Sequence, residues 1–387
     1  MSYRVIFHFG RHADEKPDPG ATIDYHRAHQ AVRIEPGQPL AHLEPIDPSA
    51  TSTTDLTVEK PEDLLSPAVE LCEEGSQLLI RSRREGFPVF ADGKITINDF
   101  LAISGDVNFR TGNIDCPGDV VVNGSIMSGF SVRAHNLTVT GSIENARVEC
   151  RGNLVCHGGI VACQDNPLVC GANLWCKYLE NSYIEAGKNI FIAKSSLHSD
   201  IRARKNIILC HQDAVLVGGC SAAGNSLYTA VLGAKWATPT EVILGCDPFL
   251  TRKLLQAQAE LAEVESEIAD LQGRIEQINT FLQHEDGEVT PAEAHRLQEE
   301  RELTENKLGF LETKLNQARR QCEDLENRVA EFKSANSDCI LQVTTHLFSG
   351  VHLVIRDAEK RIEEESGKVV LTNPEASEEI VPASGRQ

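Results

Sequence analysis

The sequence lacks the features that mark export or membrane insertion. No apolar run as long as that of a signal peptide follows Met1-Ser2-Tyr3-Arg4 at the start of the chain. No continuous apolar segment approaches the roughly 20 residues that a membrane-spanning helix needs. We therefore expect a cytoplasmic protein without membrane insertion.

Motifs that carry catalysis or hold a cofactor are also missing. The chain has no Gly-rich phosphate loop, no nucleophile elbow and no Cys/His catalytic pair. None of its 12 cysteines form a Cys-x-x-Cys pair, and the spacings Cys150/Cys156 and Cys170/Cys176 recur because the underlying sequence repeats. We interpret these cysteines as small core residues. The sequence predicts no catalytic residue, no metal and no cofactor.

Excess positive charge is absent from the chain as a whole. The formal net charge is −20, of which residues 96–246 contribute −1 and residues 247–334 contribute −9. Acidic flanks repel a phosphate backbone. We therefore expect no nucleic-acid partner.

What the chain does contain is an internal repeat between Asp106 and Asn225. Each unit has an apolar residue, a small residue two places on, a turn with Asn or Asp, and two apolar residues flanking one other position. The units start at Ile114, Val132, Val148, Leu168, Ile184, Ile201 and Cys220. Their turns carry Asp119, Asn136, Asn153, Asn173, Asn189, Asn206 and Asn225, which are 16 to 20 residues apart.

A repeat of this length, with β-branched residues alternating between Gly and Asn turns, predicts short stacked strands. The uneven spacing does not fit a left-handed helix built from six-residue repeats. The sequence therefore predicts a right-handed parallel β-helix of seven or eight coils, roughly 35 Å tall at ~4.8 Å per coil. An asparagine ladder, in which each amide bonds its neighbour in the next coil, should run along it. Its predicted members are Asn136, Asn153, Asn173, Asn189 and Asn206.

The flanks predict further units. Residues 1–24 read as a strand and a loose arm, and residues 25–95 as a small β-domain with a solvated loop from Asp47 to Pro67. The β-helix should occupy residues 96–246 and a helical insertion residues 247–334. Strands in 335–371 should then rejoin or cap the β-helix, and residues 372–387 should form a disordered tail.

The insertion shows a heptad pattern typical of a coiled coil. A break at residues 284–288, with Thr290 as the cap of a second helix, predicts an antiparallel hairpin. The alternative is that the seam pairs with a second chain, which would make a homo-oligomer. The principal seam residues are Leu254, Leu261, Ile268, Ile275, Leu282, Leu308, Leu315 and Leu325.

An apolar column should face outward on the second strand of each coil, between two inward residues. Its members are Val121, Val155, Trp175, Phe191 and Ile208, with Thr138 among them. A contiguous exposed stripe of this kind usually marks a covered surface. Either the chain's own flanking parts cover it, or it binds a partner around Trp175 and Phe191.

Charged residues also face outward beside these columns. Asp115, Glu149 and Glu185 recur one place after the first residue of a unit, but basic or apolar residues interrupt them. We interpret them as a solvated face and not as a catalytic carboxylate cluster. Lys188 and Lys205 should stack, with Arg202 and Arg204 beside them, as an ordinary charged face or as a small anion patch.

The order of these parts resembles the flagellar assembly protein A family from about residue 25 to 371. Ile114-Asp115-Cys116-Pro117-Gly118-Asp119-Val120 and Ile184-Glu185-Ala186-Gly187-Lys188-Asn189-Ile190 match the family's turn motif. Trp236-Ala237-Thr238-Pro239-Thr240-Glu241-Val242 is similar to its Gly-Thr-Pro-Thr-Glu segment, with Ala237 in place of Gly. The resemblance implies a bacterial protein for assembly or polar placement of surface machinery, with no active site.

These observations predict a non-enzymatic cytoplasmic scaffold. The β-helix would supply a rigid rod, and the coiled-coil hairpin an arm that docks protein partners of flagellar or polar machinery. The alternative hypothesis is a carbohydrate-active parallel β-helix enzyme, which would need a carboxylate cluster on one face of the helix.

Overall fold

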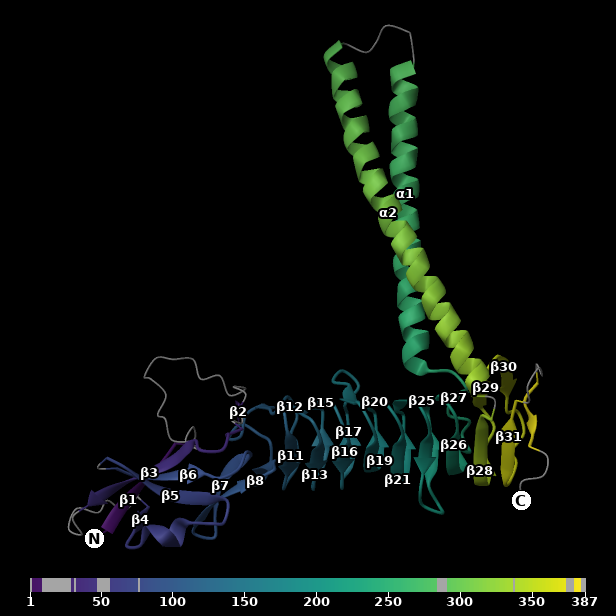
Figure 1. Cartoon of the computed structure of the whole chain (residues 1–387). Coiled ribbons are helices and arrows are strands. Elements are labelled where there is room, and N and C mark those ends of the chain that lie inside the picture. Colours follow the sequence, from purple (N-terminus) through teal and green to yellow (C-terminus); the bar gives the residue numbers. More distant parts are fainter. Residues whose placement is uncertain are drawn as a thin grey trace.

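The computed structural model describes residues 2–8, 29–30, 33–46, 56–75, 77–283, 291–336, 338–373 and 379–383. Within them the chain is mainly β, with an N-terminal sheet, a long parallel β-solenoid and one helical hairpin that projects from it (Figure 1). The predicted fold class, a parallel β-helix with a small β-domain and an inserted hairpin, is confirmed.

Two sheets run the length of the solenoid. The first face is an 11-stranded sheet in which successive coils pair in parallel, except for its last strand. Its strands are β2 (His29–Gln30), β10 (Ile114–Asp115), β12 (Ser131–Ala134), β15 (Arg147–Cys150), β18 (Leu168–Cys170), β20 (Tyr183–Ala186), β22 (Asp200–Ala203), β25 (Gly219–Ala223), β27 (Thr240–Leu244), β29 (Val351–Ile355) and β30 (Ala358–Arg361).

The second face is a 14-stranded sheet that bends around to include short strands on a third side. Its main strands are β9 (Phe100–Ile103), β11 (Asp119–Val122), β13 (Leu137–Val139), β16 (Leu154–Cys156), β19 (Leu174–Glu180), β21 (Ile190–Leu197), β23 (Ile207–Leu209), β26 (Leu227–Leu232), β28 (Ile340–Leu347), β31 (Val369–Thr372) and β32 (Val381–Pro382). The short strands are β14 (Ile143–Glu144), β17 (Gly159–Val161) and β24 (Val215–Val217).

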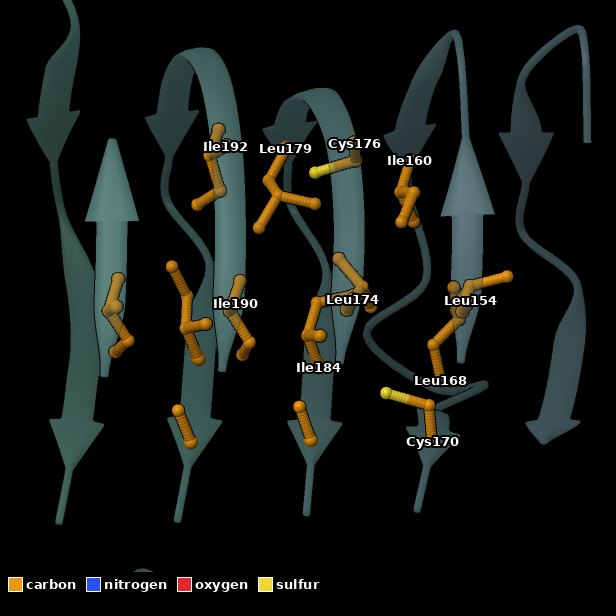
Figure 2. Close-up of a cluster of buried hydrophobic side chains, with 14 of the residues drawn as sticks. Leu154, Ile160, Leu168, Cys170, Leu174, Cys176, Leu179, Ile184, Ile190 and Ile192 are labelled. Atoms are coloured by element: carbon orange, nitrogen blue, oxygen red, sulfur yellow. The ribbon is translucent and has the colours of Figure 1, made fainter. Parts of the chain in front are cut away.

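The core consists of columns of identical or similar side chains, because alternate strand residues point inward and neighbouring coils pair in register. Leu154, Leu174 and Ile190 form one such column on β16, β19 and β21, and all three are fully buried (Figure 2). Cys170 and Cys176 occupy inward positions of the same kind. These two cysteines fill inward positions of the repeat, as the sequence pattern predicts.

The last repeat unit is shifted by one residue from its predicted register. Ile201 pairs with Ser221, and not with Cys220, and Ser221 is fully buried whereas Cys220 is half-buried. Gly218, just before this strand, and Gly219, its first residue, both adopt positive φ, which resets the alternation. The repeat pattern placed Cys220 at the inward position of this unit, and that prediction was wrong.

The N-terminal strand β1 (Ser2–Phe7) is part of the small β-domain and not a separate element. It lies between β3 (Pro39–Ile46) and β4 (Thr57–Val58) in a five-stranded sheet completed by β5 (Val69–Glu74) and β6 (Gln77–Ser82). A 3-10 helix, η2 (Pro61–Leu64), and the hairpin of β7 (Phe87–Ala91) with β8 (Lys94–Asn98) complete this region. The predicted loose arm lies mainly outside the described residues. Residues 47–55 of the predicted loop also lie outside them.

The helical hairpin consists of α1 (Pro248–Gln283) and α2 (Pro291–Ala335), which pack against each other. It is inserted between β27 and β28, and β26 pairs with β28 as β27 pairs with β29, so the solenoid continues after the insertion. The predicted break and the cap Thr290 lie outside the described residues. No helix in the described part of the chain is both long and apolar enough to cross a membrane.

Antiparallel strands close the C-terminal end of the solenoid. β30 folds back on β29 and β31 on β28. Part of the tail that was expected to be disordered from residue 372 also contributes, since β32 pairs with β31 and Ile380 is buried in the solenoid core. Burial of Ile380 and the hydrogen bond from the Ala383 N–H to the Val370 carbonyl hold this strand in place.

Candidate functional site

The outward apolar column forms a continuous stripe on the second face of the solenoid. Strand pairing aligns its members from Val121 to Ile208 at one position per coil, and Tyr228 on β26 extends it. Trp175 is 38% exposed, and the other predicted members are half-buried. The aligned residues are Val121, Thr138, Val155, Trp175, Phe191 and Ile208.

Two aromatic rings form the centre of this stripe. The rings of Trp175 and Phe191 are stacked, with centroids 5.2 Å apart and planes only 7° from parallel. The stacking follows from the one-coil offset, since paired residues of neighbouring strands lie about 4.8 Å apart. Each ring therefore covers one face of the other and presents an edge to solvent.

The described parts of the hairpin touch the solenoid away from the stripe. Their hydrogen bonds and ion pairs to the solenoid reach Tyr183 and Glu185 on β20, Arg204 after β22, and Asp357 after β29. None of the stripe residues belongs to a buried core cluster among the described residues. The hairpin leaves the solenoid beside the first face and points away from its axis (Figure 1).

The five predicted ladder asparagines lie at the turn that precedes the stripe. Asn189 donates from Nδ2 to Asn173 Oδ1 at 3.0 Å, and Asn206 donates to Asn189 Oδ1 at 2.9 Å. Asn153 bonds Asn136 through its backbone N–H at 2.7 Å, and Asn173 donates to Asn153 at 3.2 Å. The first carboxamide, of Asn136, donates to Asp119 at 2.9 Å. This chain of bonds fixes the edge of the second face.

The hairpin seam closes within the chain in two clusters. The cluster nearer the solenoid contains Leu254, Leu261 and Leu325, and the next contains Ile268, Leu308 and Leu315. Ile275 and Leu282, nearer the tip, are half-buried and belong to neither cluster. The pairing of the helices with each other accounts for the heptad pattern up to about Leu271.

A buried polar anchor joins the hairpin to the first face of the solenoid. Arg252 forms a bidentate ion pair with Glu185, which is 5% exposed, and also donates to the Tyr183 hydroxyl at 3.1 Å. Tyr183 donates in turn to Glu185 at 2.6 Å. The hydrogen bonding of Arg252 to the Glu185 carboxylate raises the pKa of the Arg252 guanidinium. Removing either charged partner would leave the other partly buried without its counter-charge.

The start of α1 supplies a second part of this anchor. Asp247 caps the helix by accepting from the backbone N–H of Phe249 at 2.9 Å, and its other oxygen pairs with Arg204 at 3.0 Å. At the other end of the hairpin, Phe332 packs over Gly224, where a Cβ would lie 2.9 Å from its ring. Both ends of the hairpin are therefore fixed to the solenoid.

Sequence reasoning did not identify this anchor. Glu185 was assigned to a solvated face, and Arg202 and Arg204 to a charged or anion-binding patch, but Arg202 lies over the Tyr183 ring at 5.0 Å and Arg204 pairs with Asp247. Glu185 and Arg252 are 67 positions apart, so no local pattern joins them. The sequence Asp247-Pro248 at a helix start was the one available signal.

Asp115 and Glu149, the other two outward carboxylates that the repeat predicted, each lie beside arginine. Arg133 lies 3.8 Å from Asp115 and 3.2 Å from Glu149, and Arg147 lies 2.7 Å from Glu149. The hydrogen bond from Arg147 keeps the pKa of Glu149 below its ordinary value. A shallow cavity of about 240 Å³ lies over these residues. A carboxylate held ionised in this way, as Glu149 is, is unsuited to act as a general acid.

A larger groove of about 660 Å³ crosses the first face near the C-terminal end. Its lining includes Cys220, Glu241 and His352, beside the loop of Trp236, which is 88% exposed. Burial, with the nearby Glu241 carboxylate, raises the pKa of Cys220 to about 12, so the thiol stays protonated at neutral pH. The His352 Nδ1 atom lies 3.4 Å from the Glu241 carboxylate, and its Nε2 atom lies 3.6 Å from that of Glu359. Both ring nitrogens are therefore directed at carboxylates and not at the Cys220 thiol.

The buried cysteines of the core are also protonated. Burial raises the pKa of Cys156 and of Cys170 to about 12, and it also raises the pKa of Cys150 and Cys176 above the ordinary value of a thiol. Among the residues that the structure describes, no three His, Cys, Asp or Glu side chains gather in a geometry that could hold a metal ion. These thiols pack against apolar neighbours in the solenoid interior.

Comparison with known proteins agrees with this architecture. Residues 99–380 match the family model described as the flagellar assembly protein A beta solenoid domain. No curated protein and no solved structure gives a significant match. The matched region covers the solenoid from β9 to β31, together with the hairpin, which is well over half of the 387 residues. The chain belongs to the flagellar assembly protein A family.

Proposed function

We propose that this protein is a non-enzymatic cytoplasmic scaffold that docks protein partners of flagellar or polar machinery. The observation that carries the proposal is the hairpin fixed at both ends to a rigid solenoid that the family model matches. The solenoid sets the position of the hairpin, and the hairpin offers a long surface at a distance from the rod. Assembly proteins need such fixed spacing between binding surfaces.

The hairpin has the surface of a docking arm. Leu303 and Phe310 on α2 are 70% and 71% exposed and lie seven residues apart, so they share one helical face. Phe281 on α1 is 62% exposed. Large apolar side chains that remain exposed beyond the closed seam favour a helix-packing partner.

The carbohydrate-active alternative has less support. Its chemistry requires a pair of carboxyl groups, one of them protonated, facing the same space. Asp115, Glu149 and Glu185 lie on different coils, and arginine neutralises each of them. The scaffold accounts for the same residues as parts of the charged face and of the hairpin anchor.

Affinity capture from the native cell tests the proposal. The bait pair is the full chain and a variant in which residues 256–331 are replaced by a short Gly/Ser link, which keeps the anchor residues Asp247 and Arg252. We expect flagellar or polar proteins with the full chain and loss of some of them with the variant. Capture of the same proteins by both baits would remove the arm from the docking role, and a capture without such proteins would contradict the proposal.

A further inference from the structure

The second face of the solenoid carries a concentration of positive charge around its aromatic centre. Four successive coils contribute the segments 151–158, 171–177, 187–194 and 204–211, which contain no Asp or Glu. The rest of the chain is strongly acidic, with a net charge of −20 overall. The basic residues of these segments are Arg151, His157, Lys177, Lys188, Lys194, Arg204, Lys205 and His211.

Lysines border the aromatic stack on both of its sides. Lys188 and Lys205 lie at the asparagine turn on adjacent coils, since the Lys205 N–H donates to the Lys188 carbonyl at 2.9 Å. Lys177 and Lys194 follow Trp175 and Phe191 along β19 and β21. All four lysines are exposed.

These four lysines differ from the arginines of the first face. Arg133 and Arg147 there both pair with Glu149. Lys177, Lys188, Lys194 and Lys205 form no ion pair with any residue in the described part of the chain, and the structure gives them no side-chain hydrogen bond there. Four unpaired lysines around an exposed apolar ridge are charge-complementary to an anionic partner.

The orientation of the Trp175 and Phe191 rings indicates which kind of anionic partner suits this surface. Sugars and nucleobases bind aromatic side chains through the ring faces. Here Trp175 and Phe191 cover a face of each other, and the edges that point outward carry partial positive charge. Edges and lysines together suit carboxylates and aliphatic side chains better than stacked bases.

We propose that the surface formed by Trp175, Phe191, Lys177, Lys188, Lys194 and Lys205 docks an acidic polypeptide segment of a protein partner. Apolar side chains of the segment pack on the aromatic ridge, and its carboxylates pair with the lysines on both sides. The inference rests on the proposed scaffold function and assigns to it a second docking surface, separate from the hairpin arm.

Trp175 itself supplies the measurement. The chain contains two tryptophans, so in a Trp236→Phe background the fluorescence of the folded protein reports on Trp175 alone. The probe is a synthetic peptide of alternating Glu and Leu, compared with a Lys and Leu peptide of the same length and with oligothymidylate. We expect saturable binding of the Glu peptide that weakens as the salt concentration rises.

Charge reversal on the surface provides the variant. Lys188→Glu with Lys205→Glu should weaken binding of the Glu peptide by about tenfold or more, because two attractive contacts become repulsive. Lys253→Glu with Lys314→Glu, on the exposed surface of the hairpin, makes the same change of charge and should alter binding by less than about twofold. Unchanged thermal unfolding of both variants establishes that they are folded.

Several outcomes would overturn the inference. They are no binding of the Glu peptide, equal binding of the Lys peptide, tighter binding of oligothymidylate, or equal weakening by the two charge reversals. None of these affects hairpin-dependent capture of flagellar or polar proteins, so a failure here is distinguishable from failure of the proposed function.

Discussion

The solenoid and the hairpin of this protein are stabilised in contrasting ways. One continuous core cluster runs through the solenoid from Phe87 to Ile380, and each inner strand is bonded to a neighbour on both sides. The hairpin has only two small clusters, separate from that core. Its 11 Lys and Arg against 20 Asp and Glu keep two long exposed helices in water, whereas the solenoid is nearly neutral. The solenoid is thus a cooperative block, and the hairpin is a module attached to it.

The largest expected effect is a cavity in the solenoid core. Leu174 is fully buried between its counterparts on β16 and β21, so Leu174→Ala should lower the free energy of unfolding by about 3 kcal/mol. Leu311→Ala in the hairpin seam should affect mainly the helices, because its cluster does not join the solenoid core. Both tryptophans lie in the solenoid region, so fluorescence follows the solenoid and far-UV ellipticity follows the helices. If Leu311→Ala lowered the stability measured by fluorescence as much as that measured by ellipticity, the hairpin would not be a separate module.

The anchor should give the next largest effect. Arg252→Ala leaves Glu185 buried without its counter-charge and should cost about 2 kcal/mol. Arg274→Ala is the matched control, since its pair with Glu300 is exposed on the hairpin and should contribute less than about 1 kcal/mol. Urea unfolding of both variants measures the difference. Equal effects would show that the anchor is no stronger than a surface pair.

The stability that this anchor contributes should decrease at alkaline pH. Burial, followed by the hydrogen bond to Glu185, raises the pKa of Tyr183 above its ordinary value of about 10. The folded state therefore holds this proton more tightly, and the resulting stability is present below about pH 10 and is lost as pH rises through the raised pKa. Tyr183→Phe should remove this part of the pH dependence. Identical stability profiles of wild type and variant between pH 9 and 11, within about 0.5 kcal/mol, would exclude the contribution.

The core cysteines should tolerate small replacements. Cys156→Ala and Cys170→Ala each remove one sulfur from the solenoid interior and should cost about 1 kcal/mol, with no change in metal content. Thiol labelling of the folded wild type should begin at Cys210, which is exposed, and leave the buried cysteines unmodified. Stoichiometric zinc in the purified protein that disappears with Cys156→Ala would contradict their role as packing residues.

The smallest effect is expected for removal of the arm. Replacing residues 256–331 by a Gly/Ser link retains Asp247, Arg252 and Phe332, so the melting transition of the solenoid should move by no more than a few degrees while most helical ellipticity is lost. The control is the same replacement combined with Arg252→Ala, which should lower the transition further. A collapse of the transition after the first replacement alone would mean that the helices stabilise the solenoid directly.

Repeated features of this fold could be predicted from the sequence because the same physical constraint acts at every coil. An inward position such as Ile184 recurs with its neighbours Leu168 and Ile201, so single irregularities do not obscure the pattern. The heptads of the hairpin are similarly redundant. The pairing of the strands, the members of the outward stripe and the positions of the turn asparagines could be predicted by aligning the repeat units.

Features that occur once could not be predicted in this way. The pair of Glu185 with Arg252 depends on the direction in which the hairpin leaves the rod, and no local sequence encodes that direction. The shift at Ser221 depends on the left-handed backbone of Gly218 and Gly219, and the position of β32 on the burial of Ile380. Each is set by one tertiary contact or one backbone conformation, with no second copy in the sequence.

The insertion of the hairpin between two strands of one coil ties its position along the rod to the number of repeats. The spacing between the N-terminal sheet and the hairpin is a whole number of coils, so it can change only in steps of about 4.8 Å, the distance between paired strands. A relative with one more or one fewer repeat would hold its arm one step farther from, or nearer to, the other end of the rod. Repeat number would thereby set, in discrete increments, the distance between the hairpin and the N-terminal end of the rod.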